Sequence, residues 1–589
     1  MASGRRTSLD SDGRRARSSS SARTGRAERR YSSAPARGAS SSRVWYALLL
    51  FVLVGAVLIV RVGYLAIIAG PSNAEDAIAA RTVTVANDAK RGTIYDRNGT
   101  VLATSVEATT VYCNPYEVKD AKGTANQIAA LLGGSPGDYI DALQAQDTSF
   151  AYVKRKIDTD AADLLKNMKL DGVYFLSDTK RVYPCGQIAG QVVGLCDTDG
   201  NGISGLELYY NDILAGTAGK SQVERGGKGY PIAGGLTEIT PSQDGQDIVV
   251  SLDIEMQEYV ETRLAQGVAD IEGKRGDAIV YDGSTGEILA CASTPYLNPA
   301  DRSSIEEGAT TLMPVNTQYE PGSIFKAITM AAVLEGGELT PASEIWCPTY
   351  LPADEYTVTD AHTRPAGDYT LSNILAASSN IGTSLAAERL GFGPLYNKII
   401  EYGFAQKTGV DFPGEATGYC AEQSTWSHIR SYNVSFGQGV MVTPVQMARF
   451  YGAIANNGTA CQPHFLISYP QTGETPAYAT TQIIQNTDIL PGLEQMLVGV
   501  TTSDEGTGKK AAIEGYEVAG KTGTAQWADD SGKYVSGSYD ISFIGYLANT
   551  DSNIVCFVGA TDVPGDRQTT LPFKDIMSFA INHYRITAQ

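Results

Sequence analysis

The sequence is poor in histidine and has no cysteine pair at zinc-binding spacing. Only four histidines occur in 589 residues, His362, His428, His464 and His583, and neither an HExxH nor a CxxC pattern is present. Zinc sites and histidine-based catalytic triads both depend on such residues. The sequence therefore argues against a metal centre and against a histidine-dependent hydrolase, and we expect no metal and no cofactor.

Positive charge is scarce outside the N-terminus. Residues 1–43 hold eleven arginines, no lysine and three acidic residues, a net charge of +8. Because the whole chain has a net charge of −19, residues 44–589 carry a net charge of −27 (−19 − 8). A folded part this acidic repels phosphate backbones, so we do not expect nucleic acid as a partner. With 589 residues and 43% hydrophobic content, the chain is long enough for more than one globular domain.

The N-terminal part predicts a tail and a membrane anchor. Residues 1–43 are mainly Arg, Ser, Ala and Gly and are predicted to be a disordered tail. Residues 44–68 are apolar apart from Arg61, which suits a transmembrane helix. A cleaved signal peptide is the alternative, although its apolar stretch is usually about 7–15 residues long. The arginines place the tail in the cytoplasm, so the chain is predicted to cross the cell membrane once, with the remaining residues outside.

The eight cysteines do not define a disulfide pattern. They are Cys113, Cys185, Cys196, Cys291, Cys347, Cys420, Cys461 and Cys556. An extracytoplasmic location permits disulfides, but burial of several as free thiols is an equally good interpretation. Cys185 and Cys196 are the closest pair in sequence and the first pair to test.

Two regions with different sequence patterns follow the anchor. Residues 75–245 are rich in turn-forming clusters, whereas residues 248–589 alternate clear strand and helix patterns. In the second region we predict helices over 253–268, 323–335, 371–378, 381–390 and 443–456, and strands over 278–281, 288–292, 517–526, 541–547 and 554–560. Two strands, a helical middle and three closing strands predict an α+β domain whose sheet is assembled from both ends of the segment.

Ser323 and Lys326 form the first of three candidate catalytic motifs. They lie at the start of the helix predicted over 323–335, where the i,i+3 spacing places both side chains on neighbouring parts of one turn. A lysine can deprotonate a serine when burial and nearby positive charge lower its pKa. A single Ser-x-x-Lys also occurs by chance in a chain of this length, and the alternative is a solvated helix start.

Ser378 and Asn380 form the second motif, between two predicted helices. The hydroxyl suits proton relay, and the carboxamide suits binding of a substrate amide. The alternative is an ordinary helix N-cap, with Ser379 or Asn380 as the capping residue.

Lys521 lies in the third motif, which allows two interpretations. Gly515–Thr522 matches the phosphate-binding pattern G-x-x-x-x-G-K-T. We reject a nucleotide site because only 67 residues follow it, Gly523 interrupts the required helix and the segment is predicted to lie outside the cell. A strand is favoured instead, in which Lys521 offers a cation to a substrate carboxylate while Thr522 and Thr524 offer hydroxyls.

Together the three motifs resemble those of a known family. Ser323-x-x-Lys326, Ser378-x-Asn380 and Lys521-Thr522-Gly523, in this order, resemble the motif set of penicillin-binding proteins and serine β-lactamases. Gly506–Gly508, Ala519–Gln526, Arg91–Gly99 and Gly202–Glu207 are similar to segments of the class B penicillin-binding proteins, of the FtsI-like or SpoVD-like kind.

The resemblance implies an architecture. Residues 248–589 would form a transpeptidase domain of the β-lactamase-like α+β type, with a five-stranded antiparallel sheet flanked by helices. Residues 75–245 would form an elongated mixed α/β pedestal of the dimerisation-domain type, in which Arg91, Asp96 and Glu207 make ion pairs that join subdomains. The loop 527–540 would be a flap facing the substrate, and no glycosyltransferase domain is expected.

The resemblance also implies a reaction. Ser323, deprotonated by Lys326, would attack the carbonyl between two D-alanines of a peptidoglycan stem peptide, with the backbone N–H groups of Ser323 and Thr524 as the oxyanion hole. Ser378 would relay the proton and Asn380 would hold the peptide. Lys521 with Thr522, Gly523 and Thr524 would bind the terminal carboxylate. An amine of a neighbouring stem would then resolve the ester, and β-lactams would acylate Ser323.

The partners and the alternatives follow from the same resemblance. We expect a role in septal synthesis, with a multi-spanning SEDS-family glycosyltransferase and divisome membrane proteins as partners. An elongation-type or sporulation-type transpeptidase has the same motifs. A D,D-carboxypeptidase or a β-lactamase has them too, and a scaffold that binds β-lactams without catalysis also stays open.

Overall fold

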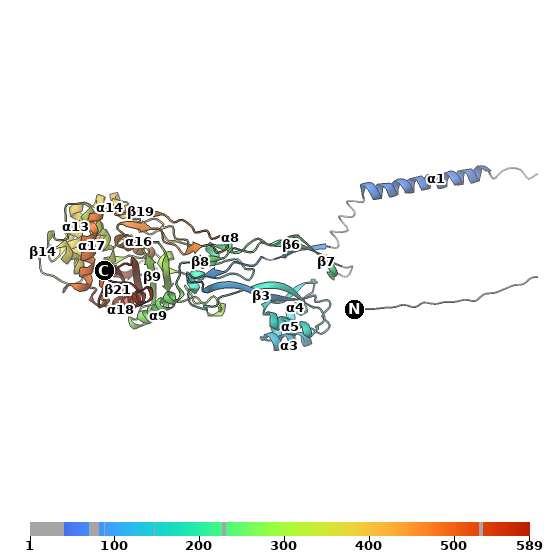
Figure 1. The fold of residues 1–589 in the computed structure, drawn as a ribbon, viewed down its shortest axis with the longest axis horizontal. Helices are drawn as coiled ribbons and strands as arrows, with labels where there is room; N and C mark the ends of the chain where they lie inside the picture. Colours follow the sequence, from blue (N-terminus) through green and yellow to red (C-terminus); the bar gives the residue numbers. More distant parts are fainter. Residues whose placement is uncertain (1–40, 70–81, 88, 147, 226–230, 529–533) are drawn as a thin grey trace, which may run out of the picture. The chain divides into compact units, whose positions relative to one another are not determined.

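A computed structural model of the chain describes residues 41–69, 82–87, 89–146, 148–225, 231–528 and 534–589 (Figure 1). They fall into two compact units: one holds the described residues up to 83 and those within 224–232, and the other holds the described residues within 84–223 and 233–589. Most of the predicted tail, residues 1–40, lies outside the described residues. Its last three residues, 41–43, are helical, so the prediction of disorder was wrong for them.

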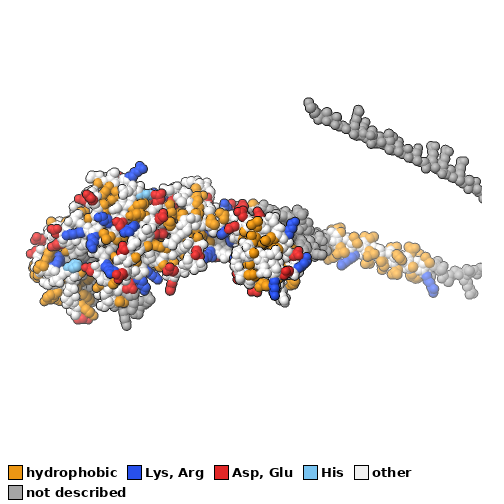
Figure 2. All heavy atoms as spheres, turned by 90° about the horizontal axis from the view of Figure 1, so that it is seen from below, with side chains coloured by type: hydrophobic (Ala, Val, Ile, Leu, Met, Phe, Trp, Pro, Cys, Tyr) orange, Lys and Arg blue, Asp and Glu red, His pale blue; other side chains and the backbone are white. Residues whose placement is uncertain are grey.

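The first unit contains a long apolar helix. Helix α1 (Ser41–Gly63) continues into a π-helical turn, η1 (Tyr64–Ile68). Within the described ranges, Arg43–Ile68 is the one helical segment long and apolar enough to cross a bilayer. None of this segment's apolar window is buried, and Figure 2 shows a surface formed mainly by hydrophobic side chains. The helix therefore has the properties of a membrane anchor.

The second unit contains a five-stranded antiparallel sheet with the order β10-β9-β22-β21-β20. Its strands are β9 (Arg275–Asp282), β10 (Ile288–Ser293), β20 (Glu517–Ala528), β21 (Tyr534–Ala548) and β22 (Ile554–Pro564). The central pairing joins β9 to β22, two strands from opposite ends of this region. The predicted α+β sheet with strands from both ends is confirmed.

Helices cover both faces of this sheet. Along β9, Ala278 and Val280 pack in one apolar cluster with α9 (Ile254–Asp270) and α18 (Thr570–Tyr584). Ile279 and Tyr281, which alternate with them, pack in the main cluster with α11 (Lys326–Glu335) and α16 (Pro444–Ala455). Nine of the ten residues of α11 are buried, so this helix runs through the core.

The remaining elements of the C-terminal region lie around this core. The helices are α10 (Met313–Asn316), α12 (Leu371–Ala376), α13 (Asn380–Leu390), α14 (Phe392–Glu401), α15 (His428–Ser435) and α17 (Leu490–Thr502). Small two-stranded ribbons pair β11 (Glu344–Cys347) with β14 (Gly367–Thr370), β12 (Leu351–Ala353) with β13 (Tyr356–Val358), β15 (Tyr419–Cys420) with β16 (Val440–Met441), and β17 (Thr459–Cys461) with β19 (Thr480–Gln482).

A six-stranded sheet dominates the region before residue 250. Its order is β18-β8-β2-β3-β4, with β5 also paired to β3. The strands are β2 (Ile94–Tyr95), β3 (Val101–Cys113), β4 (Ala151–Ile157), β5 (Val173–Val182), β8 (Ile248–Val250) and β18 (Leu466–Ser468). Segments on both sides of the predicted domain boundary therefore share one sheet.

Short helices and a second sheet complete this region. Helices α3 (Ala121–Leu132), α4 (Gly137–Leu143) and α5 (Thr159–Asn167) gather beside β3 and β4 (Figure 1). Three further helices are α6 (Gly190–Val193), α7 (Gly205–Tyr209) and α8 (Asn211–Leu214). A three-stranded sheet has the order β1-β6-β7, formed by β1 (Thr82–Asn87), β6 (Gly219–Arg225) and β7 (Pro231–Thr240).

All eight cysteines are described, and all are free thiols. Six of them are buried, and the Cys185 thiol donates to the carbonyl of Val101. The interpretation of buried small side chains therefore fits this structure, and the pairing of Cys185 with Cys196 does not form.

A buried ion-pair cluster joins several segments of the region before residue 250. Glu207 is fully buried, and its carboxylate accepts hydrogen bonds from Nε of Arg91 at 2.6 Å and from Nε of Arg181 at 2.7 Å. Asp96 differs from the expectation of an ion pair. Its carboxylate accepts the backbone N–H groups of Asn98 and Thr100 in a turn and that of Ile254 at the start of α9. Arg181 had no recognisable sequence signal, because it lies on a strand 26 residues before its partner.

We predict that Glu207→Gln lowers the free energy of unfolding by about 3–5 kcal/mol, because two buried guanidinium groups lose their counter-charge. Denaturant unfolding measures this loss. The matched control is Asp171→Asn, which breaks the exposed pair with Lys119 and should cost less than about 1 kcal/mol. Equal, small effects of the two substitutions would contradict a supporting role of the buried cluster.

Candidate active site

Ser323 lies in a 3₁₀ turn directly before α11. The turn, η3 (Gly322–Phe325), replaces the first α-helical turn that the sequence predicted. In a 3₁₀ helix the side chains at i and i+3 eclipse one another, so Lys326 is aligned with the serine. Nζ of Lys326 lies 3.0 Å from Oγ of Ser323. The two residues are therefore in direct hydrogen-bond contact.

Gly322 allows this turn to pack against strand β20. Its φ is +52°, in the left-handed region that favours glycine. A Cβ at this position would lie 2.5 Å from the carbonyl oxygen of Thr524, which is closer than any side chain tolerates. The absence of a side chain therefore brings the serine next to the third motif.

The Lys326 amine connects the first two motifs. Besides Ser323, it contacts the carbonyl oxygen of Ser378 at 2.6 Å, Oγ of Ser378 at 3.2 Å and Oδ1 of Asn380 at 2.8 Å. Burial lowers the pKa of Lys326 to about 7, with Asp360 acting to raise it and Arg364 to lower it. A neutral amine has two N–H groups and one lone pair. It can donate to the two amide oxygens and still accept the serine proton.

The second motif holds Ser378 in a strained conformation. Ser378 has φ +57°, in the left-handed region that serine rarely adopts. Ser379 caps α13 by accepting the N–H of Gly382, so the proposed N-cap role applies to this residue. Asn380 begins the helix and donates its side-chain N–H to the carbonyl of Thr359. The left-handed turn separates the cap from the hydroxyl that faces the lysines.

Lys521 lies on β20 and completes the contact between the motifs. Its Nζ donates to Oγ of Ser378 at 2.9 Å and to Oγ1 of Thr522 at 3.2 Å. Burial lowers the pKa of Lys521 well below its usual value, and the neighbouring Lys326 lowers it further. The hydroxyl of Thr522 also pairs with that of Thr507 at 2.7 Å. Because Lys521 lies in a strand, this segment does not have the form of a phosphate-binding loop.

The three motifs line one cleft of about 670 Å³. Its walls are formed by side chains and backbone of the three motifs, together with residues 357–362, Gln438, Thr507 and Gln526. Thr524 is exposed to the cleft, and β20 is the edge strand of its sheet. An edge strand can pair with an extended peptide, so the cleft suits a peptide substrate.

The predicted flap over 527–540 was too long. Strand β20 extends to Ala528 and β21 begins at Tyr534, so the two strands form a hairpin through most of this segment. Residues 529–533 lie outside the described residues. Asp540 belongs to β21.

Asp360 was missed by the sequence analysis, although it contacts Ser379 within the second motif and Ile381 directly after it. Its carboxylate accepts the hydroxyl of Ser379 and the backbone N–H of Ile381. It also pairs with Arg364 at 3.0 Å, and the Arg364 guanidinium lies over the ring of Tyr369. A single acidic residue in an irregular segment has no spacing pattern that would identify it.

Comparison with known proteins gives two family matches. Residues 276–578 match the penicillin binding protein transpeptidase domain, and residues 86–250 match the penicillin-binding protein dimerisation domain. Within the described part of the chain, no group of three His, Cys, Asp or Glu side chains is placed to hold a metal ion.

Several curated proteins are similar over most of the chain. Stage V sporulation protein D of Bacillus subtilis is 32% identical over 539 residues, which cover 89% of this chain and 82% of that protein. The peptidoglycan D,D-transpeptidase FtsI of Escherichia coli is 30% identical over 469 residues, covering 78% of this chain and 76% of that protein.

Solved structures are similar as well. A putative peptidoglycan glycosyltransferase from Atopobium parvulum has a TM-score of 0.65 and 31% identity, covering 86% of this chain and all of that one. Penicillin binding protein 3 from Mycobacterium tuberculosis, complexed with aztreonam, has a TM-score of 0.66 and 26% identity, covering 86% of this chain and 98% of that one.

We predict that Asp360→Asn slows acylation of the cleft serine by a labelled β-lactam at least ten-fold and shifts its pH dependence. In the wild type the rate should rise with pH through about 7, because only the neutral amine of Lys326 accepts a proton. Asp360 raises the pKa of Lys326, so its loss should move the midpoint below 7. Stopped-flow acylation between pH 5.5 and 8.5 measures both effects.

Asp368→Asn is the matched control, because this exposed residue lies on β14, close in sequence to Asp360. It should change neither the rate nor the midpoint. A slower Asp360→Asn enzyme with an unshifted midpoint would show that Asp360 only supports folding of the segment.

Proposed function

The chain belongs to the class B penicillin-binding proteins and is a serine-type peptidoglycan D,D-transpeptidase; from this premise we propose that Ser323 is its nucleophile and that it acts in cell division. The contact of 3.0 Å between Nζ of Lys326 and Oγ of Ser323 carries the proposed site. A β-lactam is then a covalent ligand of the same serine.

The first step is formation of an acyl-enzyme. Lys326 accepts the hydroxyl proton of Ser323 while Oγ attacks the carbonyl carbon between two D-alanines of the donor stem. The negative charge that develops on the carbonyl oxygen is placed between the backbone N–H groups of Ser323 and Thr524, on two segments that the close packing of Gly322 brings together.

Departure of the terminal D-alanine needs a proton on its nitrogen. Oγ of Ser378 lies between the two lysines, 3.2 Å from Nζ of Lys326 and 2.9 Å from Nζ of Lys521. It therefore passes the proton from Lys326 to the leaving amine as the C–N bond breaks. Asn380 holds the donor peptide from the same side of the cleft.

Lys521 binds the terminal carboxylate of the donor. In the absence of a counter-charge its pKa is low, and an incoming carboxylate favours the protonated form. The hydroxyls of Thr522 and Thr524 add donors on the same strand, and Gly523 leaves the strand open between them. Substrate binding thus restores the positive charge that burial opposes.

The second step transfers the acyl group to an amine. A neutral amine of an acceptor stem forms the new C–N bond with the ester carbonyl carbon, and the bond to Oγ of Ser323 breaks. The one proton released by the amine passes through the Lys326–Ser378 pair to Oγ of Ser323, and the other N–H stays in the new amide. The product is a cross-linked peptide.

We expect that Ser323→Ala abolishes covalent labelling by a fluorescent penicillin, because it removes the hydroxyl 3.0 Å from Nζ of Lys326 that is the proposed nucleophile. Gel fluorescence after denaturation measures the adduct. The control Ser303→Ala changes a surface serine in the same region and should label like the wild type. Residual labelling of the Ser323→Ala protein would assign the nucleophile elsewhere, and rapid loss of the wild-type adduct would indicate a hydrolase.

Further assignments support the division role. The run Ala519–Gln526 and the similarity to proteins named FtsI and stage V sporulation protein D support septal synthesis.

Residues 75–245 would serve as the pedestal and residues 248–589 as the catalytic domain outside the membrane. The eleven arginines of residues 1–43 support a cytoplasmic N-terminus. A multi-spanning glycosyltransferase of the SEDS type and divisome proteins are the proposed partners.

A fluorescent fusion of the full chain should collect at mid-cell before constriction. Wild type, but not Ser323→Ala, should restore division in cells depleted of the protein. Localisation along the side wall would support an elongation role, and restoration by Ser323→Ala would support a scaffold.

A further inference from the structure

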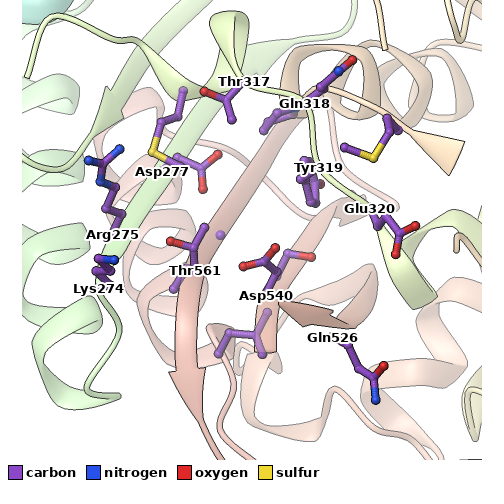
Figure 3. A pocket seen from close by; sticks show the side chains of 17 residues that line it. Lys274, Arg275, Asp277, Thr317, Gln318, Tyr319, Glu320, Gln526, Asp540 and Thr561 are labelled. Atoms are coloured by element: carbon purple, nitrogen blue, oxygen red, sulfur yellow. The ribbon is translucent and has the colours of Figure 1, made fainter. Parts of the chain in front are cut away.

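A second pocket, of about 660 Å³, lies beside the catalytic cleft (Figure 3). Its walls come from β9, from the segment that leads into η3, from the start of α16 and from β21 and β22. Gln526 lines both the pocket and the cleft, and Glu320 lines the pocket three residues before Ser323. The pocket therefore adjoins the place where the acyl-enzyme forms.

Asp277 is a buried carboxylate that faces this pocket. Its side chain is on β9 and is only 5% exposed, yet no hydrogen bond or ion pair joins it to any residue in the described ranges. Gly559 is its register partner on β22, where a Cβ would lie 2.4 Å from Oδ1 of Asp277. The chain thus leaves room for a charge that it does not neutralise, at a cost in stability.

Two further oxygen atoms of the same pocket are also buried without a hydrogen-bond partner. They are Oδ1 of Asp540 and the hydroxyl of Tyr319. Burial, together with the charge of Asp540, raises the pKa of Asp277 to about 7. Burial is also the main cause that raises the pKa of Asp540 to about 7. Burial and both carboxylates raise the pKa of Tyr319 well above its usual value, so the phenol stays protonated. Three side chains that carry oxygen atoms without a hydrogen-bond partner among the described residues therefore line this pocket.

These oxygens select a cation with several N–H donors. A primary ammonium has three N–H groups, which match two carboxylates and the phenol oxygen. The described residues contain no group of three His, Cys, Asp or Glu side chains suited to a metal ion. Arg275, at the start of β9, also lines the pocket (Figure 3). Its charge favours a ligand that carries a carboxylate next to its ammonium.

We propose that this pocket binds the acceptor stem peptide through a primary ammonium group with a neighbouring carboxylate. The inference rests on the proposed function, in which an amine acceptor must reach the acyl-enzyme at Ser323. The pocket holds the amine in its charged, unreactive form next to the cleft. The ammonium then transfers one proton to the carboxylate of Asp277 or Asp540 and leaves the pocket as the neutral amine that attacks the ester.

Partitioning of the acyl-enzyme tests this assignment. Full-length protein in detergent is acylated by a thioester analogue of the donor, and the products of aminolysis and hydrolysis are separated. Glycine is the charged acceptor, and hydroxylamine, neutral at pH 7.5, is the reference nucleophile. We expect Asp277→Asn and Asp540→Asn to raise the glycine concentration for half-maximal aminolysis at least ten-fold, with less than a two-fold change for hydroxylamine.

Asp282→Asn is the matched control, because Asp282 ends the same strand but hydrogen-bonds to Ser284 in a turn away from the pocket. It should leave both acceptors unchanged. Tyr319→Phe, which removes only the hydroxyl, should weaken glycine use by roughly three-fold because one neutral hydrogen bond is lost.

Thermal melting separates binding from folding. Asp277→Asn should melt at the wild-type temperature or above it, because an unpartnered buried charge is removed. Lower melting with equal losses for glycine and hydroxylamine would make the carboxylates structural and overturn the proposal. Normal acylation with unchanged glycine use would overturn the proposal alone, whereas failure of the wild type to be acylated would overturn the proposed function with it.

Discussion

Burial of one amine is the constraint on which the proposed chemistry of this molecule depends. Lys326 sits at the start of a helix that runs through the core, and its Nζ contacts the hydroxyl groups of Ser323 and Ser378 together with an amide oxygen of Asn380. In water a lysine amine holds its proton too firmly to serve as a base near neutral pH. Desolvation by the surrounding core removes that preference, so the apolar packing of the domain is itself a part of the catalytic apparatus.

The sheet supplies the second constraint. Lys521 lies on an edge strand near the C-terminal end of the chain, whereas the turn η3, which holds Ser323, follows the hairpin β9–β10. Gly322 permits the two segments to touch at a distance no side chain would allow. Lys326 and Lys521 then share Oγ of Ser378, and the charge of Lys326 disfavours protonation of Lys521. In the proposed mechanism, Lys521 therefore gains its positive charge when a substrate carboxylate binds.

The sequence predicted the elements with regular patterns and failed where contacts are irregular. The strands around 278–292 and 517–560 alternate or run apolar, and they form as expected. The three motifs were found because their spacing is local. Asp360 and Arg181 were missed because each acts on residues that only the fold brings near. The loop predicted over 527–540 was too long, because the polar residues of a β-hairpin resemble those of a turn in the sequence. The pocket of Asp277 and Asp540 joins strands more than 250 residues apart, and no local pattern links them.

The pairing of β9 with β22 has a consequence for biosynthesis. Asp282 lies opposite Ile554, so the central seam of the catalytic sheet closes only across about 270 residues. Contacts of such long sequence separation form late, after local hairpins and helices. While the chain is being made, the segment that holds Ser323 precedes the strand that holds Lys521 by almost 200 residues. In the proposed mechanism a nascent chain therefore has no reactive serine, and catalytic competence begins only when the last strands have emerged and docked.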